Sequence, residues 1–204
     1  MRGFSDEERE RIREELVETG RELLVTYGPE KTNVADVTEP VGIAKSTFYR
    51  FFDSKTDLYL EVFTRESEDF QERVEAKLAG VNDPQEGLER LFRCYAEFAE
   101  GNLLVQRMIT SDNYRELFGD VSPERMAEYQ AEGMAAYAPF VERFQAKGSG
   151  PLEGMEPRTV LGVMGTIGLL VLHEEEYEQY GEGYYEEVRD ALVTTLARGL
   201  TAGE

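Results

Sequence analysis

The segment that decides the fold is TNVADVTEPVGIAKSTFYRFFDSKTDL, which runs from Thr32 to Leu58. Asn33 opens it with a capping pattern, because its side-chain oxygen can accept hydrogen bonds from the backbone N–H groups of a first helical turn. This pattern predicts a short helix to about Glu39. Pro40 cannot lie deep inside a helix, and Gly42 permits a tight turn, so a turn is expected here.

A second short helix is predicted after this turn, from about Ala44 to Phe51. Asp53 and Ser54 end it, and Ser54 with Asp57 predicts the cap of a further helix. Helix, glycine-bearing turn and helix form the layout of a helix-turn-helix motif, whose second helix enters the major groove of DNA. Six apolar residues can pack the two short helices against the long helix before them: Val34, Val37, Val41, Ile43, Phe48 and Phe52.

The second short helix also carries the chemistry that DNA binding needs. Residues 40–52 contain two cations and no acid, although the chain has 42 Asp and Glu residues against 22 Lys and Arg residues and a net charge of −20. The other interpretation of these residues alone is a helical hairpin with a solvated, slightly basic face. The outward side chains that can bind phosphate oxygens or base edges are Lys45, Ser46, Thr47, Tyr49 and Arg50.

The segment resembles the N-terminal domain of the TetR family of transcriptional regulators. The family pattern is an apolar helix, then Gly-x-x-x-Thr-(Ser/Thr)-Val-x-Asp-Ile-Ala, then Ala-Gly-Val-Ser-x-Gly-(Ser/Thr)-(Leu/Phe)-Tyr-x-(Tyr/His)-Phe-x-x-Lys-x-x-Leu. The resemblance covers about the first 60 residues and is specific in residue type and spacing. The corresponding residues are Gly28, Thr32, Asn33, Val34, Asp36, Val37, Val41, Gly42, Ile43, Ala44, Ser46, Thr47, Phe48, Tyr49, Phe51, Phe52, Lys55 and Leu58.

The resemblance implies a set of DNA-binding residues. Lys45, Thr47 and Arg50 are expected to contact bases or phosphates. Tyr49 and Lys55 are expected to contact the backbone of the DNA. The full predicted set is Asn33, Ala44, Lys45, Ser46, Thr47, Tyr49, Arg50 and Lys55.

Three positions near helix ends bear on this prediction. Asn33 can donate to a phosphate while it caps its helix. Ala44 stands where the family usually has Ser, so the second helix lacks a side-chain cap worth about 1 kcal/mol. A phosphate bound at the exposed amides would substitute for it in part. Pro40 lies where the family usually keeps a helical residue, so the first short helix is expected to end early.

The rest of the chain predicts helices and no strands, so the fold class is all-α. Residues 1–53 are expected to form a three-helix, helix-turn-helix DNA-binding domain, and residues 54–204 a helical-bundle domain for ligand binding and dimerisation. Ser5 with Glu8 forms a capping-box pattern that predicts a first helix, which Gly28 and Pro29 end. Asp83 and Ser122 each precede a proline and predict helix starts. The expected elements are helices over about 84–100, 123–146, 158–176 and 182–200, a broken helix from Asn102 to Phe118 and a loop from Lys147 to Pro157.

Apolar stripes near the C-terminal end predict a homodimer. A helix that is apolar nearly all round, as Thr159 to Leu172 would be, must be covered on two sides. A two-fold, four-helix interface, which the family resemblance implies, covers it and sets two recognition helices about 34 Å apart, one turn of DNA. The alternative is burial within one chain. The expected interface residues are Gly162, Gly165, Leu169, Tyr185, Val188, Leu192 and Thr195.

The middle helices are rich in aromatic residues. The family resemblance implies an effector pocket here, whose filling changes the spacing of the two DNA-reading helices through its differential affinity for two conformations. The alternative for each residue is ordinary core packing. The abundance of aromatic side chains predicts an apolar or aromatic effector of unknown identity. The candidate lining residues are Tyr95, Phe98, Met108, Tyr129, Met134 and Tyr137.

The composition argues against several other classes of protein. Cys94 is the only cysteine, which excludes a disulfide framework and a multi-cysteine metal site. His173, the only histidine, belongs to neither an HExxH nor a Glu-x-x-His motif. No enzyme, catalytic residue, metal or cofactor is therefore predicted. The N-terminus has no apolar signal region and no apolar stretch reaches the length of about 20 residues that a membrane span needs, so a cytoplasmic protein without membrane contact is expected.

The charge leaves one alternative function open. A uniformly acidic surface with five lysines resembles the surfaces of halophilic proteins, from organisms that accumulate salt. In about 1 M salt the Debye length falls to roughly 3 Å, which weakens the repulsion of DNA. The prediction is a repressor that binds a palindromic operator as a homodimer and is released by its effector. The alternative is a helical protein-interaction or ligand-sequestering module without DNA binding.

Overall fold

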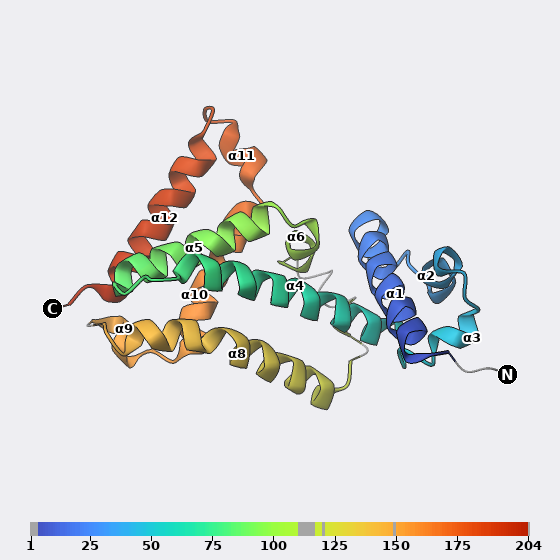
Figure 1. The fold of residues 1–204 in the computed structure, drawn as a ribbon. Coiled ribbons are helices and arrows are strands. Elements are labelled where there is room, and N and C mark those ends of the chain that lie inside the picture. The colour runs from blue at the N-terminus through green and yellow to red at the C-terminus, as the bar shows by residue number, and fades with distance from the viewer. Residues whose placement is uncertain (1–3, 110–116, 120, 149, 204) are drawn as a thin grey trace. The chain divides into compact units, whose positions relative to one another are not determined.

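The computed structural model describes residues 4–109, 117–119, 121–148 and 150–203 (Figure 1). All regular structure within these residues is helical, which confirms the all-α prediction. None of the described helices combines the length and the apolar character needed to cross a membrane. The helices are α1 (Asp6–Tyr27), α2 (Val34–Val41), α3 (Lys45–Phe48), α4 (Lys55–Leu78), α5 (Pro84–Glu100), α6 (Leu103–Ile109), α8 (Pro123–Gln145), α9 (Pro151–Gly154), α10 (Pro157–Val171), α11 (Glu174–Glu178) and α12 (Tyr184–Thr201).

The chain divides into two compact units. The first consists of Met1–Ser67 with Arg107–Ala127, and the second of Glu68–Gln106 with Glu128–Glu204. Helices α4, α6 and α8 therefore contribute residues to both units. The expected functional boundary between residues 53 and 54 stays a prediction.

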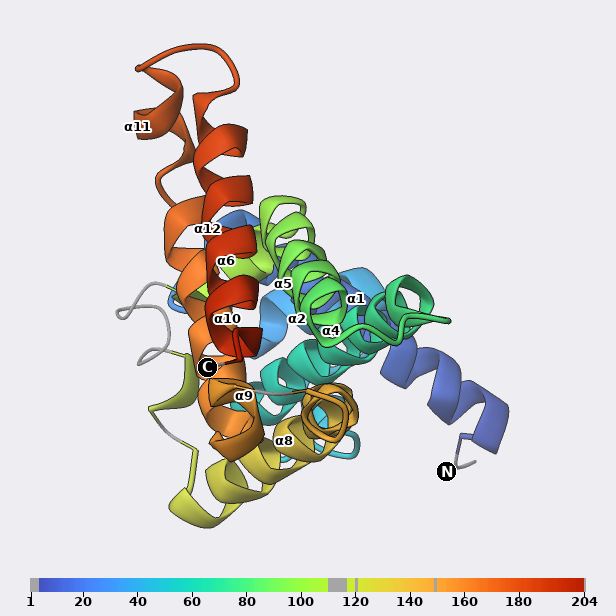
Figure 2. The same ribbon diagram turned by 90° about the vertical axis from the view of Figure 1, so that its left-hand side faces the viewer.

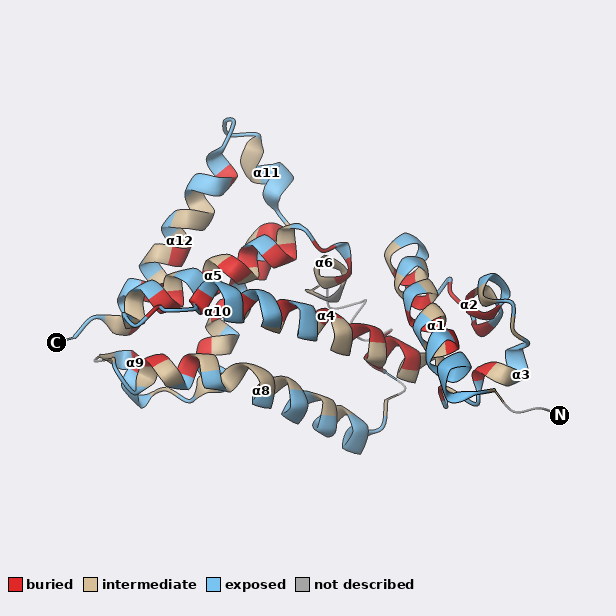
Figure 3. Cartoon of the chain, viewed as in Figure 1, coloured by how far each residue is buried: buried red, intermediate tan, exposed pale blue. Residues whose placement is uncertain are grey.

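The first unit has a small core to which each of its first four helices contributes. Leu16, Val37, Phe48 and Leu58 come from α1, α2, α3 and α4 in turn, and all four are fully buried. Figure 3 shows buried positions on each of these helices. A Cβ atom at Gly20 of α1 would lie only 2.9 Å from a methyl carbon of Leu58. Glycine at this position therefore allows α4 to pack closely on α1, at the cost of some helix propensity.

The ends of α1 confirm the prediction for the first helix. The Glu8 backbone N–H donates to the Ser5 hydroxyl at 3.1 Å, and the Ser5 N–H donates to the Glu8 carboxylate at 3.2 Å, which forms a complete capping box. At the other end Gly28 has φ +78°, and its N–H donates to the Leu24 carbonyl at 3.0 Å. Local sequence signals therefore set both ends of this helix.

Helices α2 and α3 differ in length from the predictions. Helix α2 runs past Pro40 to Val41. The proline is tolerated because it lies in the last turn, where only one backbone hydrogen bond is lost. Helix α3 is only four residues long, because the chain after Phe48 tightens into turns: the Arg50 N–H donates to the Thr47 carbonyl at 3.0 Å, a three-residue spacing.

The second unit packs α5 against α10 and α12 around one large apolar cluster. Phe92 and Phe144 are fully buried in it, and Gly87 of α5 lies directly beneath the Phe144 ring. A Cβ atom at Gly87 would overlap the atoms of that ring, so glycine provides the notch into which the ring fits. The starts predicted at Asp83 and Ser122 are confirmed, since each side chain accepts from a backbone N–H of its helix.

Two further helices depart from the expected boundaries. The predicted helix over residues 158–176 is interrupted at His173, whose backbone has φ −113° and ψ 19° and separates α10 from α11. The expected loop from Lys147 to Pro157 contains the short helix α9, with Pro151 at its first position. Figure 2 shows α10 and α12 side by side, with α11 and a loop joining them at one end.

A polar network fastens α12 to α5. The Arg189 guanidinium donates to both oxygens of Glu100, at 2.9 and 3.1 Å, and the Tyr185 hydroxyl donates to the same carboxylate at 2.7 Å. Arg93 of α5 pairs with Asp190 beside it. Burial and the Glu100 charge raise the pKa of the Tyr185 hydroxyl well above its ordinary value.

Candidate nucleic-acid interface

The first half of the helix-turn-helix is fixed by local hydrogen bonds. The Asn33 side-chain oxygen accepts from the N–H groups of Ala35 at 2.8 Å and Asp36 at 3.3 Å, and Asp36 accepts from the Asn33 N–H at 2.8 Å. Gly42 then adopts a left-handed conformation with φ +72°, and its N–H donates to the Glu39 carbonyl at 3.1 Å. These bonds end α2 and aim the chain into α3.

The second half of the helix-turn-helix, α3, is held by the burial of apolar side chains and not by a side-chain cap. Ala44 precedes α3 without any side-chain hydrogen bond to the first turn. Phe48 is fully buried, and its ring lies 5.7 Å from that of Phe52. Because Phe48 points inward, the rest of the short helix must face solvent.

The side chains predicted to contact DNA from α3 and the following turn lie on the surface. Lys45, Ser46 and Arg50 are exposed, Tyr49 is 51% exposed, and Thr47 is half-buried. The surface made by these five residues and Ala44 is here called the recognition face. It offers hydroxyl, ammonium and guanidinium donors within one helical turn and the turn that follows.

Aromatic side chains position the cations at one edge of the recognition face. The Arg50 guanidinium lies 5.0 Å from the centre of the Phe4 ring, which lies 6.2 Å from the Phe51 ring. The Arg9 guanidinium lies 5.8 Å from the same Phe51 ring. Arg9 is exposed and is a cation near this face that sequence reasoning missed, because only the fold brings α1 beside the end of α3.

Lys55, predicted to contact the DNA backbone, has a structural role in this unit. Its ammonium donates to the carbonyls of Pro29 at 2.8 Å and Thr32 at 2.7 Å, and lies 5.5 Å from the Tyr59 ring centre. These bonds fasten the start of α4 to the loop between α1 and α2. No pattern within the sequence signalled this role, because the partners are backbone atoms distant along the chain.

Tyr59 beneath this lysine is a buried titratable group. Burial raises the pKa of its hydroxyl to about 12, and the Asp36 charge acts in the same direction while the Thr32 hydroxyl opposes it. No described residue makes a hydrogen bond of ordinary geometry with this hydroxyl. Tyr59 therefore belongs to the core under the motif and not to its surface.

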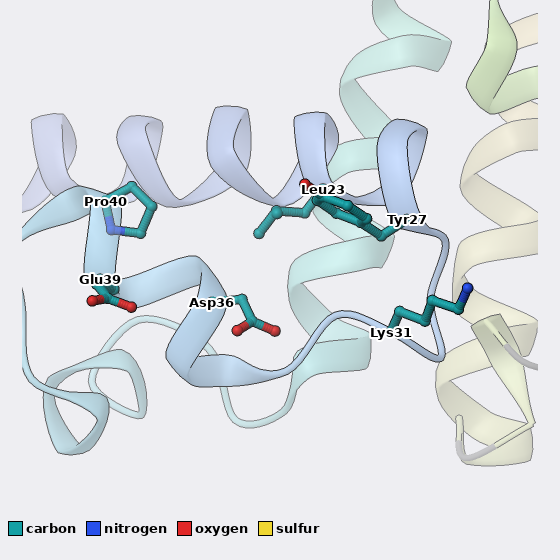
Figure 4. A pocket seen from close by; sticks show the side chains of 6 residues that line it. All are labelled: Leu23, Tyr27, Lys31, Asp36, Glu39 and Pro40. Atoms are coloured by element: carbon teal, nitrogen blue, oxygen red, sulfur yellow. The ribbon is translucent and has the colours of Figure 1, made fainter.

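One pocket of about 470 Å³ lies on the first unit between α1 and α2, and no residue of the recognition face lines it (Figure 4). Leu23 and Tyr27 of α1 form one wall, and Asp36 and Glu39 of α2 place carboxylates on the other, as Figure 4 shows. Two carboxylates against one ammonium, that of Lys31, make the site unsuited to phosphate. We assign no function to it.

The residues predicted to contact an effector are partly brought together. Tyr95, Phe98 and Tyr137 surround Phe70, with ring centres 5.9, 4.8 and 5.5 Å from its own. Burial raises the pKa of the Tyr95 hydroxyl. The other candidates are Tyr129 and Met134, both half-buried on α8, and Met108, whose side chain lies outside the described part of the structure.

The residues predicted for the dimer interface lie mostly on the outer sides of α10 and α12, but Tyr185 is buried and Leu192 packs against the core of its own unit. Leu169 is 52% exposed, and a Cβ atom at Gly162 or Gly165 would meet no other atom. Tyr185 departs from the expectation, because it is 1% exposed and bonded to Glu100 inside its own unit. The remaining candidates are Val188 and Leu192, which are half-buried, and Thr195, which is exposed.

Comparison with known proteins agrees with this geometry. Residues 16–62 match the model of the family described as "Bacterial regulatory proteins, tetR family". The transcriptional activator FasR of Mycolicibacterium smegmatis is 24% identical over 106 residues, which are 52% of this chain and 48% of FasR. The transcriptional regulator TcmR of Streptomyces glaucescens is 31% identical over 91 residues, which are 45% of this chain and 40% of TcmR. The matches therefore span less than half the length of these two proteins.

The fold of the whole chain is also found among solved structures. The transcriptional regulator FadR of Bacillus subtilis, solved in complex with stearoyl-CoA, superimposes with a TM-score of 0.64 at 16% identity. This match covers 94% of the present chain and 98% of that one. It extends the structural likeness well beyond the motif, into the helices after residue 62.

Proposed function

We propose that this chain is a DNA-binding transcriptional regulator of the TetR family that acts as a repressor, because residues 16–62 match the model of that family and the regulator TcmR is 31% identical over 91 residues. The operator is palindromic, a homodimer binds it, and a small-molecule effector releases it. The observation that carries the proposal is the recognition face, where Lys45, Thr47 and Arg50 stand outward over a buried Phe48. A helix presented in this way is what enters the major groove in helix-turn-helix proteins.

The proposed dimer uses the outer faces of α10 and α12. Gly162 and Gly165 leave α10 open to close approach by another helix, and Leu169 offers an exposed apolar side chain beside them. Val188, Leu192 and Thr195 recur on α12 at helical spacing, so they share one face. Covering both faces with a second copy supplies the two-fold symmetry that a palindromic operator requires.

The proposed effector is apolar or aromatic in the part that enters the second unit. The rings of Tyr95, Phe98 and Tyr137 pack around Phe70 and make this part of the second unit apolar and aromatic, which is the chemistry that such an effector would meet. The structural relative FadR binds stearoyl-CoA, a molecule with a long apolar chain. For the effector to release the DNA, it must bind more tightly to a conformation of the dimer in which the distance between the two recognition faces does not match the spacing of the two operator half-sites.

The test is a fluorescence-anisotropy titration of the purified protein with the DNA upstream of its own gene. Arg50→Ala and Lys45→Ala are each expected to weaken specific binding by about 10- to 100-fold if the side chain makes a bidentate contact with O6 and N7 of a guanine. The matched control is Arg90→Ala, which removes an exposed arginine of α5 that pairs with Glu86. Its affinity for DNA should equal that of the unchanged protein.

A potassium chloride series separates regulation from the alternative. The logarithm of the affinity should fall with the logarithm of the salt concentration with a slope of about −0.9 per phosphate contact. Because the chain carries a charge of −20, folding is expected to gain from salt, so affinity should rise before it falls. Absence of a specific complex at every salt concentration would overturn the proposal in favour of an interaction module without DNA binding.

A further inference from the structure

The end of the second unit where α10 passes into α12 has an unusual surface. This segment, His173 to Glu187, is here called the acidic tip. It consists of α11, the loop 179–183 and the first turn of α12 (Figure 2). It contains seven glutamates and neither lysine nor arginine, so its formal charge is −7. Its charge is opposite in sign to that of the recognition face, which carries Lys45 and Arg50 and no acidic residue.

Three tyrosine rings gather on this tip. The Tyr184 ring centre lies 6.1 Å from that of Tyr177, nearly parallel at 28°, and 5.8 Å from that of Tyr180. Tyr180 is 81% exposed, more than any other large hydrophobic side chain that is described. Together with His173 and Glu176 the three rings line a pocket of about 400 Å³. This volume lies within the range of sites for small molecules.

The pocket is held in shape by a single carboxylate. Glu178 accepts from the backbone N–H of Gly183 at 3.1 Å and from that of Tyr185 at 3.0 Å. These bonds cap the N-terminus of α12 and close the loop that carries Tyr180. Gly183 adopts φ +78°, a conformation that favours glycine. These bonds hold the backbone of the loop that carries Tyr180 and of the turn that carries Tyr184.

We propose that the tyrosine pocket of the acidic tip binds a small molecule that bears a quaternary ammonium group. The faces of Tyr177, Tyr180 and Tyr184 carry the negative lobes of the ring quadrupoles and attract a cation that lies over them. The methyl groups of such a cation lose apolar surface to the same rings. Glu176 supplies a carboxylate at the rim.

The electrostatics of the tip favour a cation over neutral or anionic ligands. Burial, followed by the charges of Glu100, Glu186 and Glu178, raises the pKa of Glu174, and the Arg189 charge acts against this. Carboxylates that repel one another in this way are relieved by a positive charge placed among them. An ammonium group that retained N–H donors would be more strongly hydrated than one fully methylated, and would gain less from the rings.

The experiment measures choline binding to the full-length protein by ligand-observed saturation-transfer NMR at constant ionic strength. Its neutral isostere, 3,3-dimethylbutan-1-ol, has the same shape and a carbon in place of the nitrogen. Choline is expected to bind saturably and at least about 10-fold more tightly than the alcohol, since only the cation gains from the rings and carboxylates. Glycine betaine, which adds a carboxylate, should bind more weakly than choline because the tip repels its negative end.

Substitutions assign the binding to the pocket. Tyr180→Ala should weaken choline binding by about five-fold, and Tyr180→Phe, which keeps the ring, should leave it within about two-fold. Glu176→Gln is expected to weaken it by about two-fold. Tyr27→Ala, which removes an exposed tyrosine of α1, is the control and should change nothing.

Three results would overturn the proposal. They are the absence of saturable choline binding, equal affinity for choline and its neutral isostere, and an unchanged choline affinity in Tyr180→Ala. Circular dichroism of Tyr180→Ala shows whether this exposed substitution leaves the helices intact. None of these three results depends on DNA, so the proposal is tested apart from the regulatory function.

Discussion

The two units of the chain hold their helices together by different means. In the first unit, short helices depend on polar devices at their ends, such as the Asn33 capping box and the ammonium of Lys55 on two loop carbonyls. In the second unit, long helices are joined mainly by a large apolar cluster with a glycine notch at Gly87, and the polar network at Glu100 adds to it between α5 and α12. A small core buries little apolar surface, so its helices also need hydrogen bonds to hold them together. A larger core is stabilised mainly by burial and depends on how closely its side chains fit together.

The largest expected effect on stability comes from filling the glycine notch at Gly87 in the second unit. Gly87→Ala places a methyl group where the buried Phe144 ring lies, so the free energy of unfolding should fall by about 2–3 kcal/mol in urea. Gly133→Ala on α8 makes the same change in open space and should stabilise the protein by up to about 1 kcal/mol. Adding Phe144→Leu to Gly87→Ala should recover part of the loss, with a coupling of about 1 kcal/mol or more. Additive losses would mean that the notch is not what the ring requires.

A smaller effect on stability is expected when the hydrogen bonds of the Lys55 ammonium in the first unit are removed. Lys55→Met keeps the aliphatic stem and removes the charged donors to Pro29 and Thr32, and should lower the free energy of unfolding by about 1.5 kcal/mol. Lys31→Met, at an exposed lysine of the same unit, should change it by less than about 0.5 kcal/mol. If Lys55→Met leaves stability intact and weakens only DNA binding, the lysine is a DNA contact and its loop bonds are incidental.

The smallest expected effects on stability come from substitutions at the N-caps of the two short helices, α2 and α3. Ala44→Ser supplies the missing cap of α3 and should raise the free energy of unfolding by about 0.5–1 kcal/mol. Asn33→Ala removes the existing cap of α2 and should lower it by about 1 kcal/mol. Thermal unfolding of both variants measures the difference. A neutral Ala44→Ser beside a costly Asn33→Ala would show that burial of Phe48 alone determines the order of α3.

The parts of the fold that could be predicted from the sequence are those set by neighbouring residues. The caps at Ser5, Asn33 and Asp83 act within three residues of themselves, and the structure confirms each of them. The alternation of buried and outward residues around Phe48 follows from helical spacing, and it produced the recognition face. The motif therefore carries its own geometry in its local sequence.

The parts that escaped prediction depend on partners far along the chain. Lys55 binds carbonyls 26 and 23 residues before it, and Tyr185 turns inward because Glu100 lies 85 residues away. The notch at Gly87 has meaning only when Phe144 arrives from another helix. The helical periodicity of the sequence predicts which residues share one face of a helix. It does not predict which of two apolar faces of that helix packs against the core.

The four-residue length of α3 has a consequence for how the recognition face can be lost. Helices shorter than about 12 residues do not persist in water without tertiary support. A synthetic peptide copied from residues 42–53 would therefore be unstructured. Substitutions of the buried residues that support Phe48 would disorder the recognition face without changing any of its exposed side chains.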